Sequence, residues 1–123
     1  MPSKSAASPL ESHLGYALRI VSNAVSHGFA RKVAADGVTV AEWVLMRVLY
    51  DVDRHAPTAL AERMGMTKGA ITKLAHRLVD KGLVERTADP DDKRAQTLAL
   101  TKRGRALVPR LARRADANDA EFF

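Results

Sequence analysis

A helical pattern between Thr67 and Lys81 keeps its polar residues on one side and its apolar residues on the other. Ammonium, guanidinium, imidazole and hydroxyl groups supply positive charge and hydrogen-bond donors, so their clustering on one face suits the binding of an anion. The polar side consists of Lys68, Gly69, Thr72, Lys73, His76 and Arg77, and the apolar side of Ile71, Leu74, Ala75 and Leu78. The alternative interpretation is an ordinary solvated helix face.

A second cluster of charge follows in the stretch DPDDKR, where three carboxylates stand beside two cations. Pro90 predicts a turn, in which the side-chain oxygens of Asp89 and Asp91 can accept hydrogen bonds from backbone N–H groups. We expect Asp92 to be an anchor that pairs with a basic residue of the preceding helix or of the turn itself. The three aspartates then shape and orient the turn, and Arg94 is expected to extend outward from it.

The charge of the chain is concentrated around these two clusters. Lys and Arg number 20 against 14 Asp and Glu, a formal net charge of +6, yet 13 of the basic and only 5 of the acidic residues lie between Thr67 and Arg114. Such an asymmetry indicates a polyanionic partner, most simply nucleic acid. Arg-rich helix faces on a protein with no such partner are the alternative.

The other residues that could do chemistry do not form a catalytic pattern. The chain has no cysteine, which excludes disulfides, thiolate zinc sites and thiol redox sensing. The aspartate cluster lacks the glycine and terminal glutamate of a calcium loop, and there is no nucleophile elbow or phosphate-cradling glycine loop. The histidines lack the i,i+4 spacing of a metal site; they are His13, His27, His55 and His76. The sequence predicts a protein that is not an enzyme and that has no cofactor.

The lengths of the apolar runs in the sequence predict where the protein is located. None approaches the roughly 20 residues of a membrane helix. Residues 1–9 lack the apolar core of a signal peptide and are expected to be a disordered lead-in. The sequence therefore predicts a cytoplasmic protein with no membrane partner.

The first part of the chain contains the pattern of two helices. From Leu10 to about Ala35, apolar residues recur three or four apart, and the pattern ends at Asp36-Gly37. Thr39 and Glu42 then form a capping box that starts a second helix. That helix is expected to run to about Asp53 and to be central to the core through Trp43, Val44, Leu45, Val48, Leu49 and Val52.

The middle of the chain predicts a helix-turn-helix followed by a hairpin. Thr58 and Thr67 are expected to cap two short helices joined at Gly65-Met66-Thr67. Alternation with a period of two then predicts strands over 83–87 and 96–101. A helix-turn-helix with such a hairpin is a winged helix. A last helix begins at Thr101 and is expected to kink at Pro109.

These segments resemble the MarR family of bacterial transcription regulators. The resemblance rests on APTALAERMGMTKGAITKLAHRLVDKGLVER, DPDDKRA and LALTKRGR, with HLGYALRI and VTVAEWVLMRVL before them. It covers the chain from about residue 10 to the end and is densest between Leu60 and Gly104. It implies an α+β, mostly helical fold. It also implies a winged helix-turn-helix DNA-binding domain over 36–101, flanked by dimerisation helices over 10–35 and 102–123.

The resemblance also implies which residues contact double-stranded DNA. A helix of this kind enters the major groove, with Thr72 and Lys73 as the expected base contacts and Gly69 allowing close backbone approach. His76 and Arg77 are expected nearer the phosphates, and free N–H groups predict phosphate binding at the helix start. The expected phosphate ligands are Thr67 and Lys68 at that start and Thr58 at the start of the preceding helix. The expected hairpin residues are Asp92, Lys93 and Arg94. Members of the family insert an arginine into the minor groove at the Arg94 position.

Further expectations come from the family's mode of action. The resemblance implies a homodimer that represses genes by binding a pseudo-palindromic operator; the alternative is a winged-helix module that binds an acidic protein and no DNA. Family members usually end with a further helix, so we expect an incomplete C-terminal helix with Phe122 and Phe123 exposed. Many bind small aromatic or phenolic anions, for which the expected residues are His13, Tyr16, Arg19, Trp43, Arg47 and Tyr50. Trp43 and Tyr50 have a simple core role as their alternative.

Overall fold

The chain is mostly helical with one small antiparallel sheet, as the sequence predicts. The computed structural model describes the backbone of residues 9–89, 91 and 95–123, and the side chains of these residues from Ser22 onward. Its elements are α2 (Pro9–Ala34), α3 (Val40–Tyr50), α4 (Pro57–Met64), α5 (Lys68–Asp80), β1 (Val84–Ala88), β2 (Gln96–Leu100) and α6 (Lys102–Phe122).

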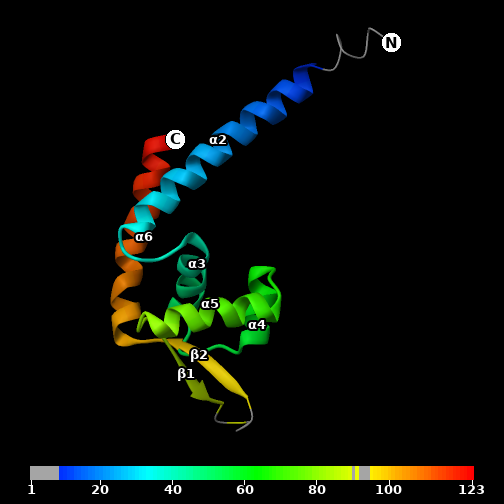
Figure 1. Cartoon of the computed structure of the whole chain (residues 1–123). Helices are drawn as coiled ribbons and strands as arrows, with labels where there is room; N and C mark the ends of the chain where they lie inside the picture. Colours follow the sequence, from blue (N-terminus) through cyan, green and yellow to red (C-terminus); the bar gives the residue numbers. More distant parts are fainter. Residues whose placement is uncertain (1–8, 90, 92–94) are drawn as a thin grey trace.

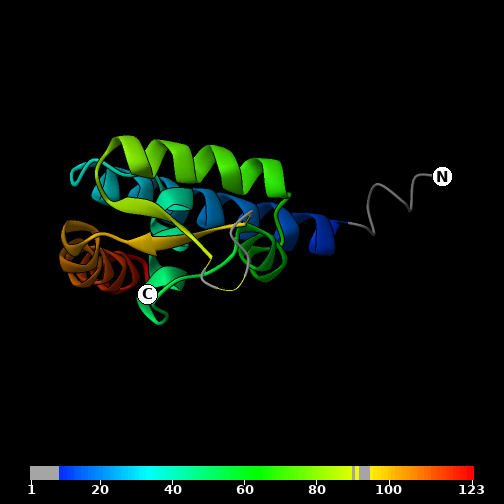
Figure 2. The same ribbon diagram turned by 90° about the horizontal axis from the view of Figure 1, so that it is seen from below.

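The elements form a helix pair and a lobe. Figure 1 shows the C-terminal part of α2 lying beside α6 at one end, with α3, α4, α5 and the hairpin gathered at the other end. The N-terminal half of α2 extends beyond the lobe. In the view from below, α5 lies on one side of the hairpin and α6 on the other (Figure 2). None of the described helices is long and apolar enough to cross a membrane.

Side-chain caps fix the start of three helices. The capping box of α3 is confirmed: the Glu42 N–H donates to Thr39 Oγ1 over 3.1 Å, and the Thr39 N–H donates to Glu42 Oε1 over 2.7 Å. Thr67 Oγ1 accepts from the Ala70 N–H at the start of α5. Thr101 Oγ1 does the same for the Gly104 N–H at the start of α6. Local hydrogen bonding therefore decides where these helices begin.

The prediction that Thr58 caps α4 is wrong. The N-cap is Ala56, which makes no side-chain cap bond, and Pro57 occupies the first turn. Proline fixes φ near the helical value and has no N–H to satisfy, so a helix that starts on it needs less help from a cap. Thr58 lies inside the helix.

The core lies where α3 meets the other elements of the lobe and α6. The buried side chains include Leu45, Met46 and Leu49 of α3, Leu60 of α4 and Leu111 of α6. The expectation that Val44 belongs to this core is wrong, because 39% of it is exposed. α3 also ends at Tyr50, three residues before the predicted end at Asp53. Val44 lies on the side of α3 opposite the buried residues Met46 and Leu49.

The hairpin forms with a register that runs from Val84 opposite Leu100 to Ala88 opposite Gln96. A further bridge, absent from the predictions, joins it to the chain before α4. The His55 N–H donates to the Leu98 carbonyl over 2.9 Å, and the Leu98 N–H donates back over 2.8 Å. This pairing attaches the middle of β2 to the chain just before α4.

The end of α6 packs on α2. The expectation that both terminal aromatics are exposed is half wrong: Phe123 is 86% exposed, but Phe122 is partly buried. The Phe122 ring lies so close to Gly28 that an added Cβ there would meet it at 2.7 Å. Lys32 Nζ lies 5.8 Å from the centre of the same ring. α6 is continuous through Pro109.

Glu42 is a buried carboxylate shared between α3 and α5. Its Oε1 accepts from Lys81 Nζ over 2.7 Å, and its Oε2 lies 3.5 Å from Arg77 Nε with no hydrogen bond among the described residues. Burial alone raises the pKa of Glu42, but the bonds from Lys81 and the Thr39 N–H, with the Lys81 and Arg77 charges, lower it below its ordinary value.

Glu42→Gln should destabilise the fold by about 1–2 kcal/mol in urea unfolding at neutral pH, since it removes a charged acceptor beside partly exposed cations. A depressed folded pKa gives stability that is fully present above the unfolded value near 4.5 and lost as the pH falls through the folded pKa. The gap to the parent protein should therefore close in that acidic range. Glu62→Gln, at an exposed position on α4, is the control and should show no gap.

Gly104→Ala should destabilise the fold by about 1–3 kcal/mol, because overpacking against backbone cannot be relieved by a rotamer change. A Cβ at this position would lie 2.0 Å from the Leu83 carbonyl oxygen. Thermal unfolding measures the change, with Gly69→Ala as the matched helical control because nothing lies within 4 Å of its added methyl group. An unchanged melting temperature for Gly104→Ala would contradict this packing.

Candidate nucleic-acid interface

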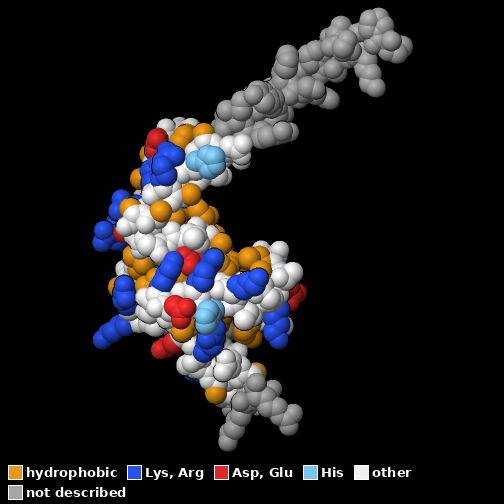
Figure 3. Space-filling view, in the orientation of Figure 1, with side chains coloured by type: hydrophobic (Ala, Val, Ile, Leu, Met, Phe, Trp, Pro, Cys, Tyr) orange, Lys and Arg blue, Asp and Glu red, His pale blue; other side chains and the backbone are white. Residues whose placement is uncertain are grey.

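Helix α5 separates its core residues from its polar residues as predicted. Ile71, Leu74, Ala75 and Leu78 are buried. The opposite side is exposed along its whole length, and Figure 3 shows Lys and Arg side chains gathered over α5 across the middle of the molecule. The structure brings together on this face Lys68, Gly69, Thr72, Lys73, His76 and Arg77.

The cations of this face differ in whether an acidic side chain of the protein already lies beside them. Arg77 is drawn toward the buried Glu42, and His76 Nε2 lies 3.5 Å from Asp80 Oδ2. Lys68 and Lys73 have no ion-pair partner within the described part of the chain. These two ammonium groups are therefore the ones most available to an incoming anion.

The hydroxyl groups of α5 are also partly used. The Thr72 hydroxyl donates to the Lys68 carbonyl over 2.9 Å, which leaves its oxygen able to accept a hydrogen bond. Thr67 caps the helix. The N–H groups of the first turn point out of the helix, where an anion is stabilised by them and by the helix dipole.

A hollow of about 250 Å³ lies beside the start of α5. It is lined by the first residues of α4, by Lys68 and by the start of β2, so it brings together Thr58 and Lys68, both of which the sequence predicts to bind phosphate. Gln96 also lines it. The hollow offers a hydroxyl, an ammonium and an amide within one concave surface, all of which can donate to an anionic oxygen.

Arg86 of β1 is a candidate that sequence reasoning missed. It lines a hollow of about 420 Å³ together with Thr72, Lys73, His76 and Arg77. The signal was available in the strand period, because Val84 is buried and Arg86 stands two residues further along the same side. The hollow joins the polar face of α5 to the hairpin.

The tip of the hairpin is described only in part. Asp92, Lys93 and Arg94 lie outside the described residues. The polar turn predicted beside them is present at Asp89, whose Oδ1 accepts from the Asp91 N–H over 2.9 Å and whose own N–H donates to the Ala95 carbonyl.

Other cations near the hairpin are used to hold helix ends. Arg103 donates to the Lys81 carbonyl over 3.2 Å. Arg105 donates to the carbonyls of Tyr50 and Val52, and its guanidinium lies 5.4 Å from the Tyr50 ring centre. Their charge contributes to the local field, but their donors bind this chain.

The residues predicted to bind an aromatic ligand differ in their burial and in the contacts that they make. The side chains of His13, Tyr16 and Arg19 lie outside the described ones. Trp43 is buried and meets Phe29 edge to face at 6.5 Å, which favours its core interpretation. Arg47 pairs with Asp51 over 2.9 Å and lies 5.7 Å from the Tyr50 ring centre.

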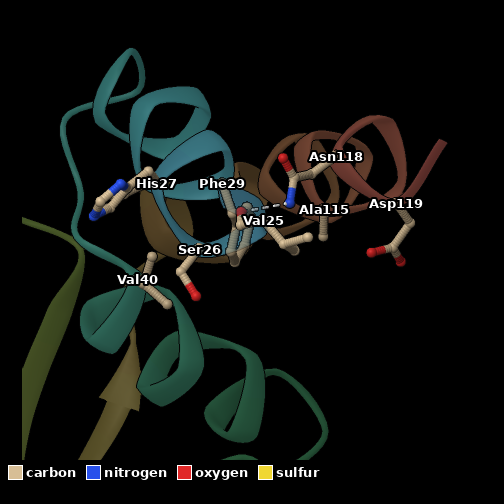
Figure 4. A pocket seen from close by; sticks show the side chains of 9 residues that line it. Val25, Ser26, His27, Phe29, Val40, Ala115, Asn118 and Asp119 are labelled. Atoms are coloured by element: carbon tan, nitrogen blue, oxygen red, sulfur yellow. Dashed lines mark hydrogen bonds between the residues drawn. The ribbon is translucent and has the colours of Figure 1, made fainter. Parts of the chain in front are cut away.

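A cavity of about 420 Å³ lies elsewhere, between α2, α6 and the start of α3. Figure 4 shows Val25, Phe29, Ala115 and Asn118 facing one another there, with Asn118 donating to the Val25 carbonyl over 3.0 Å. The described members of the predicted ligand set do not line it. Among the described residues, no group of three or more His, Asp or Glu could hold a metal ion.

Comparison with known proteins agrees with the winged-helix geometry. The family model described as MarR family matches residues 38–95. The HTH-type transcriptional repressor YetL of Bacillus subtilis is 32% identical over 88 residues, 70% of this chain and 53% of YetL. The chain thus spans about half to two thirds of the length of the curated relatives that it matches; for a mycobacterial protein at 35% identity the share is 57%.

Solved structures extend the likeness to most of the chain. The MarR family protein Rv2887 of Mycobacterium tuberculosis has a TM-score of 0.74 at 30% identity, with 88% of this chain and 77% of that chain covered. CouR from Rhodococcus jostii RHA1, solved with p-coumaroyl-CoA, has a TM-score of 0.78 at 27% identity, covering 89% and 78%. The capped helix-turn-helix, the paired hairpin and these matches agree: the chain belongs to the MarR family.

Proposed function

We propose that this chain is a sequence-specific DNA-binding transcription regulator. The observation that carries the proposal is the exposed polar face of α5, where Lys68 and Lys73 are unpaired within the described residues while the opposite face is anchored in the core. An α-helix fits the major groove of B-DNA, and a rigid, one-sided helix can present a fixed set of donors to base edges.

In this proposal the polar face divides into base and phosphate contacts. Thr72 and Lys73 read base edges at the centre of the face, and Gly69 lets the backbone come close. Thr67 and Lys68 hold a phosphate at the helix start, with Thr58 in the adjoining hollow. His76, Arg77 and the newly identified Arg86 bind the backbone on the hairpin side. The hairpin tip adds Lys93 and an Arg94 inserted into the minor groove, oriented by Asp92.

The active form in this proposal is a homodimer that represses transcription from a pseudo-palindromic operator in the cytoplasm. α2 projects beyond the lobe, and the apolar spacing of its sequence provides a stripe that a second copy can cover. In this division, residues 10–35 and 102–123 dimerise and residues 36–101 bind DNA. A two-fold dimer places two copies of α5 one helical turn apart. The name of YetL, a repressor, supports the sign of regulation.

Release by a small aromatic or phenolic effector completes the proposed cycle. CouR is a relative by structure whose solved complex holds p-coumaroyl-CoA. The α3 residues Arg47 and Tyr50 are the described side chains assigned to such a ligand, together with His13, Tyr16 and Arg19 of α2. Trp43, whose burial favours a core role, is not assigned to it. An effector would act by favouring a separation of the two α5 helices that does not fit the operator.

The alternative function is a protein-binding module whose basic face docks an acidic partner without binding DNA. Titrating the chain with duplex DNA at increasing salt separates the two. DNA binding releases counterions, so affinity should fall steeply and linearly on a log–log plot as salt rises. If the protein binds no duplex DNA even at low salt, the protein-binding module is the function that remains.

Lys73→Ala should weaken binding to a duplex selected by the protein from a random-sequence pool by about 1–3 kcal/mol, and relax specificity at one base pair. Fluorescence anisotropy at fixed salt measures the loss. Arg113→Ala removes the same charge from an exposed position on α6 and is the matched control. Equal losses in the two variants would mean that Lys73 contributes only net charge.

Gly69→Ala separates folding from binding. The added methyl group meets no atom within 4 Å and improves helix propensity, so stability should rise by about 0.5–1 kcal/mol. The same methyl group projects from the face assigned to the major groove, so DNA affinity should fall although the protein melts at a higher temperature. Undiminished affinity would contradict close backbone approach at this position.

A further inference from the structure

The segment Asp36–Glu42 runs from the connection after α2 into the first turn of α3 and carries a buried carboxylate at each end; we call it the strap. Asp36 faces α6, with its side chain only 5% exposed. Arg110 Nε lies 2.9 Å from Asp36 Oδ1, and Arg114 Nε lies 3.0 Å from Oδ2. Both carboxylate oxygens are thus held by guanidinium groups one turn apart on the same helix.

The other end of the strap faces α5. Glu42 is fully buried and binds Lys81 Nζ over 2.7 Å, with Arg77 Nε at 3.5 Å. The same Lys81 ammonium also donates to the Gly37 carbonyl over 2.8 Å, so it reaches both ends of the strap. Lys81 is the C-cap of α5, and its own carbonyl accepts from Arg103 of α6.

These contacts link the helix pair to the polar face of α5. Arg110 and Arg114 belong to the helix that packs along α2, whereas Lys81 and Arg77 belong to the last turns of α5. In each pair the carboxylate is buried and its cations are partly exposed, so removing the cations would leave a buried charge unpaired; this favours one arrangement of the network.

We propose that the strap sets the orientation of α5 relative to the α2–α6 pair, and that Asp36 and Glu42 are positioning residues for DNA binding. The proposal rests on the DNA-binding function above. Neither carboxylate lies on the exposed face of α5, so each acts through the cations that it holds. The strap then transmits the placement of the helix pair to the surface that reads DNA.

The sign of the charge change makes this proposal testable. Asp36→Asn and Glu42→Gln each make the protein more positive, so electrostatic attraction alone predicts tighter DNA binding. Loss of positioning predicts the opposite for a specific site, where the donors of α5 must meet particular base edges. Non-specific binding needs only positive charge and should not weaken.

The experiment compares a duplex selected from a random pool by the parent protein with a scrambled duplex of the same composition. Both variants should bind the selected duplex about 2- to 30-fold more weakly, the range seen for residues that couple through a network. Affinity for the scrambled duplex should not fall, because no phosphate contact is lost and the protein becomes more positive. Circular dichroism at the assay temperature verifies folding.

Two control variants and one milder variant are measured beside Asp36→Asn and Glu42→Gln. Asp51→Asn breaks an exposed ion pair within one turn, and Glu62→Gln changes a lone exposed carboxylate. Neither control should weaken specific binding. Arg114→Gln leaves Asp36 held by Arg110 and keeps the test available should Asp36→Asn unfold. Equal weakening on both duplexes, or none on the selected one, would overturn the proposal.

A double variant tests whether Glu42 acts through its partner. If positioning runs through Lys81, then Glu42→Gln with Lys81→Met should lose no more specific affinity than either change alone. Additive losses would show that Glu42 and Lys81 contribute separately, against the strap.

A distance measurement tests the strap without DNA. The chain has no native cysteine, so spin labels at Asp80→Cys on α5 and Ala117→Cys on α6 report one chosen pair, both at exposed positions. The distance distribution should broaden when Asp36→Asn or Glu42→Gln is added; an identical distribution overturns the proposal. A parent protein that selects no duplex would instead refute the DNA-binding function, while the label distances still decide on the strap.

Discussion

The buried carboxylate of Glu42 is the contact on which the arrangement of the lobe depends. It satisfies the first turn of α3 through the Thr39 N–H and binds α5 through Lys81, so one side chain serves a local cap and a long-range ion pair. A buried charge is costly unless it is paired and hydrogen-bonded. Helix α3 therefore cannot pack in the core without α5 placing its cations beside it.

That constraint gives α5 three attachments with different physical origins. Its apolar side is held by the core, its first turn by the Thr67 cap, and its end by Lys81 and Gly82. Gly82 has a φ of 73°, a conformation that glycine adopts without strain, and it turns the chain directly toward Leu83 and β1. These three attachments fix the orientation of α5. Its remaining side makes no contact with the core and can carry residues that bind a partner. The hairpin that follows is fixed in turn through the His55 bridge.

Sequence reasoning succeeded where neighbours in the chain decide the structure. The capping box at Thr39, the cap at Thr67 and the two sides of α5 all follow from residues three or four apart, so the winged helix and most of its polar face could be predicted. It failed where distant segments meet. Nothing in the spacing shows that Asp36 faces α6 or that Phe122 covers Gly28. Thr58 failed for a local reason, because the preceding proline had already started the helix.

The basic residues of the second half of the chain thus serve two purposes that composition cannot distinguish. Arg103 and Arg105 bind helix-end carbonyls, Arg110 and Arg114 bind Asp36, and Lys81 binds Glu42, so these five cations hold the fold together. Lys68, Lys73 and Arg86 make no ion pair among the described residues and line the hollows beside α5. A net charge of +6 does not give the number of phosphates that the chain can neutralise, since the counterions released depend on contacts made and not on charge carried. The same pairing that removes cations from the surface holds the remaining ones in place, and a fixed set of few donors can discriminate between base edges better than many mobile ones.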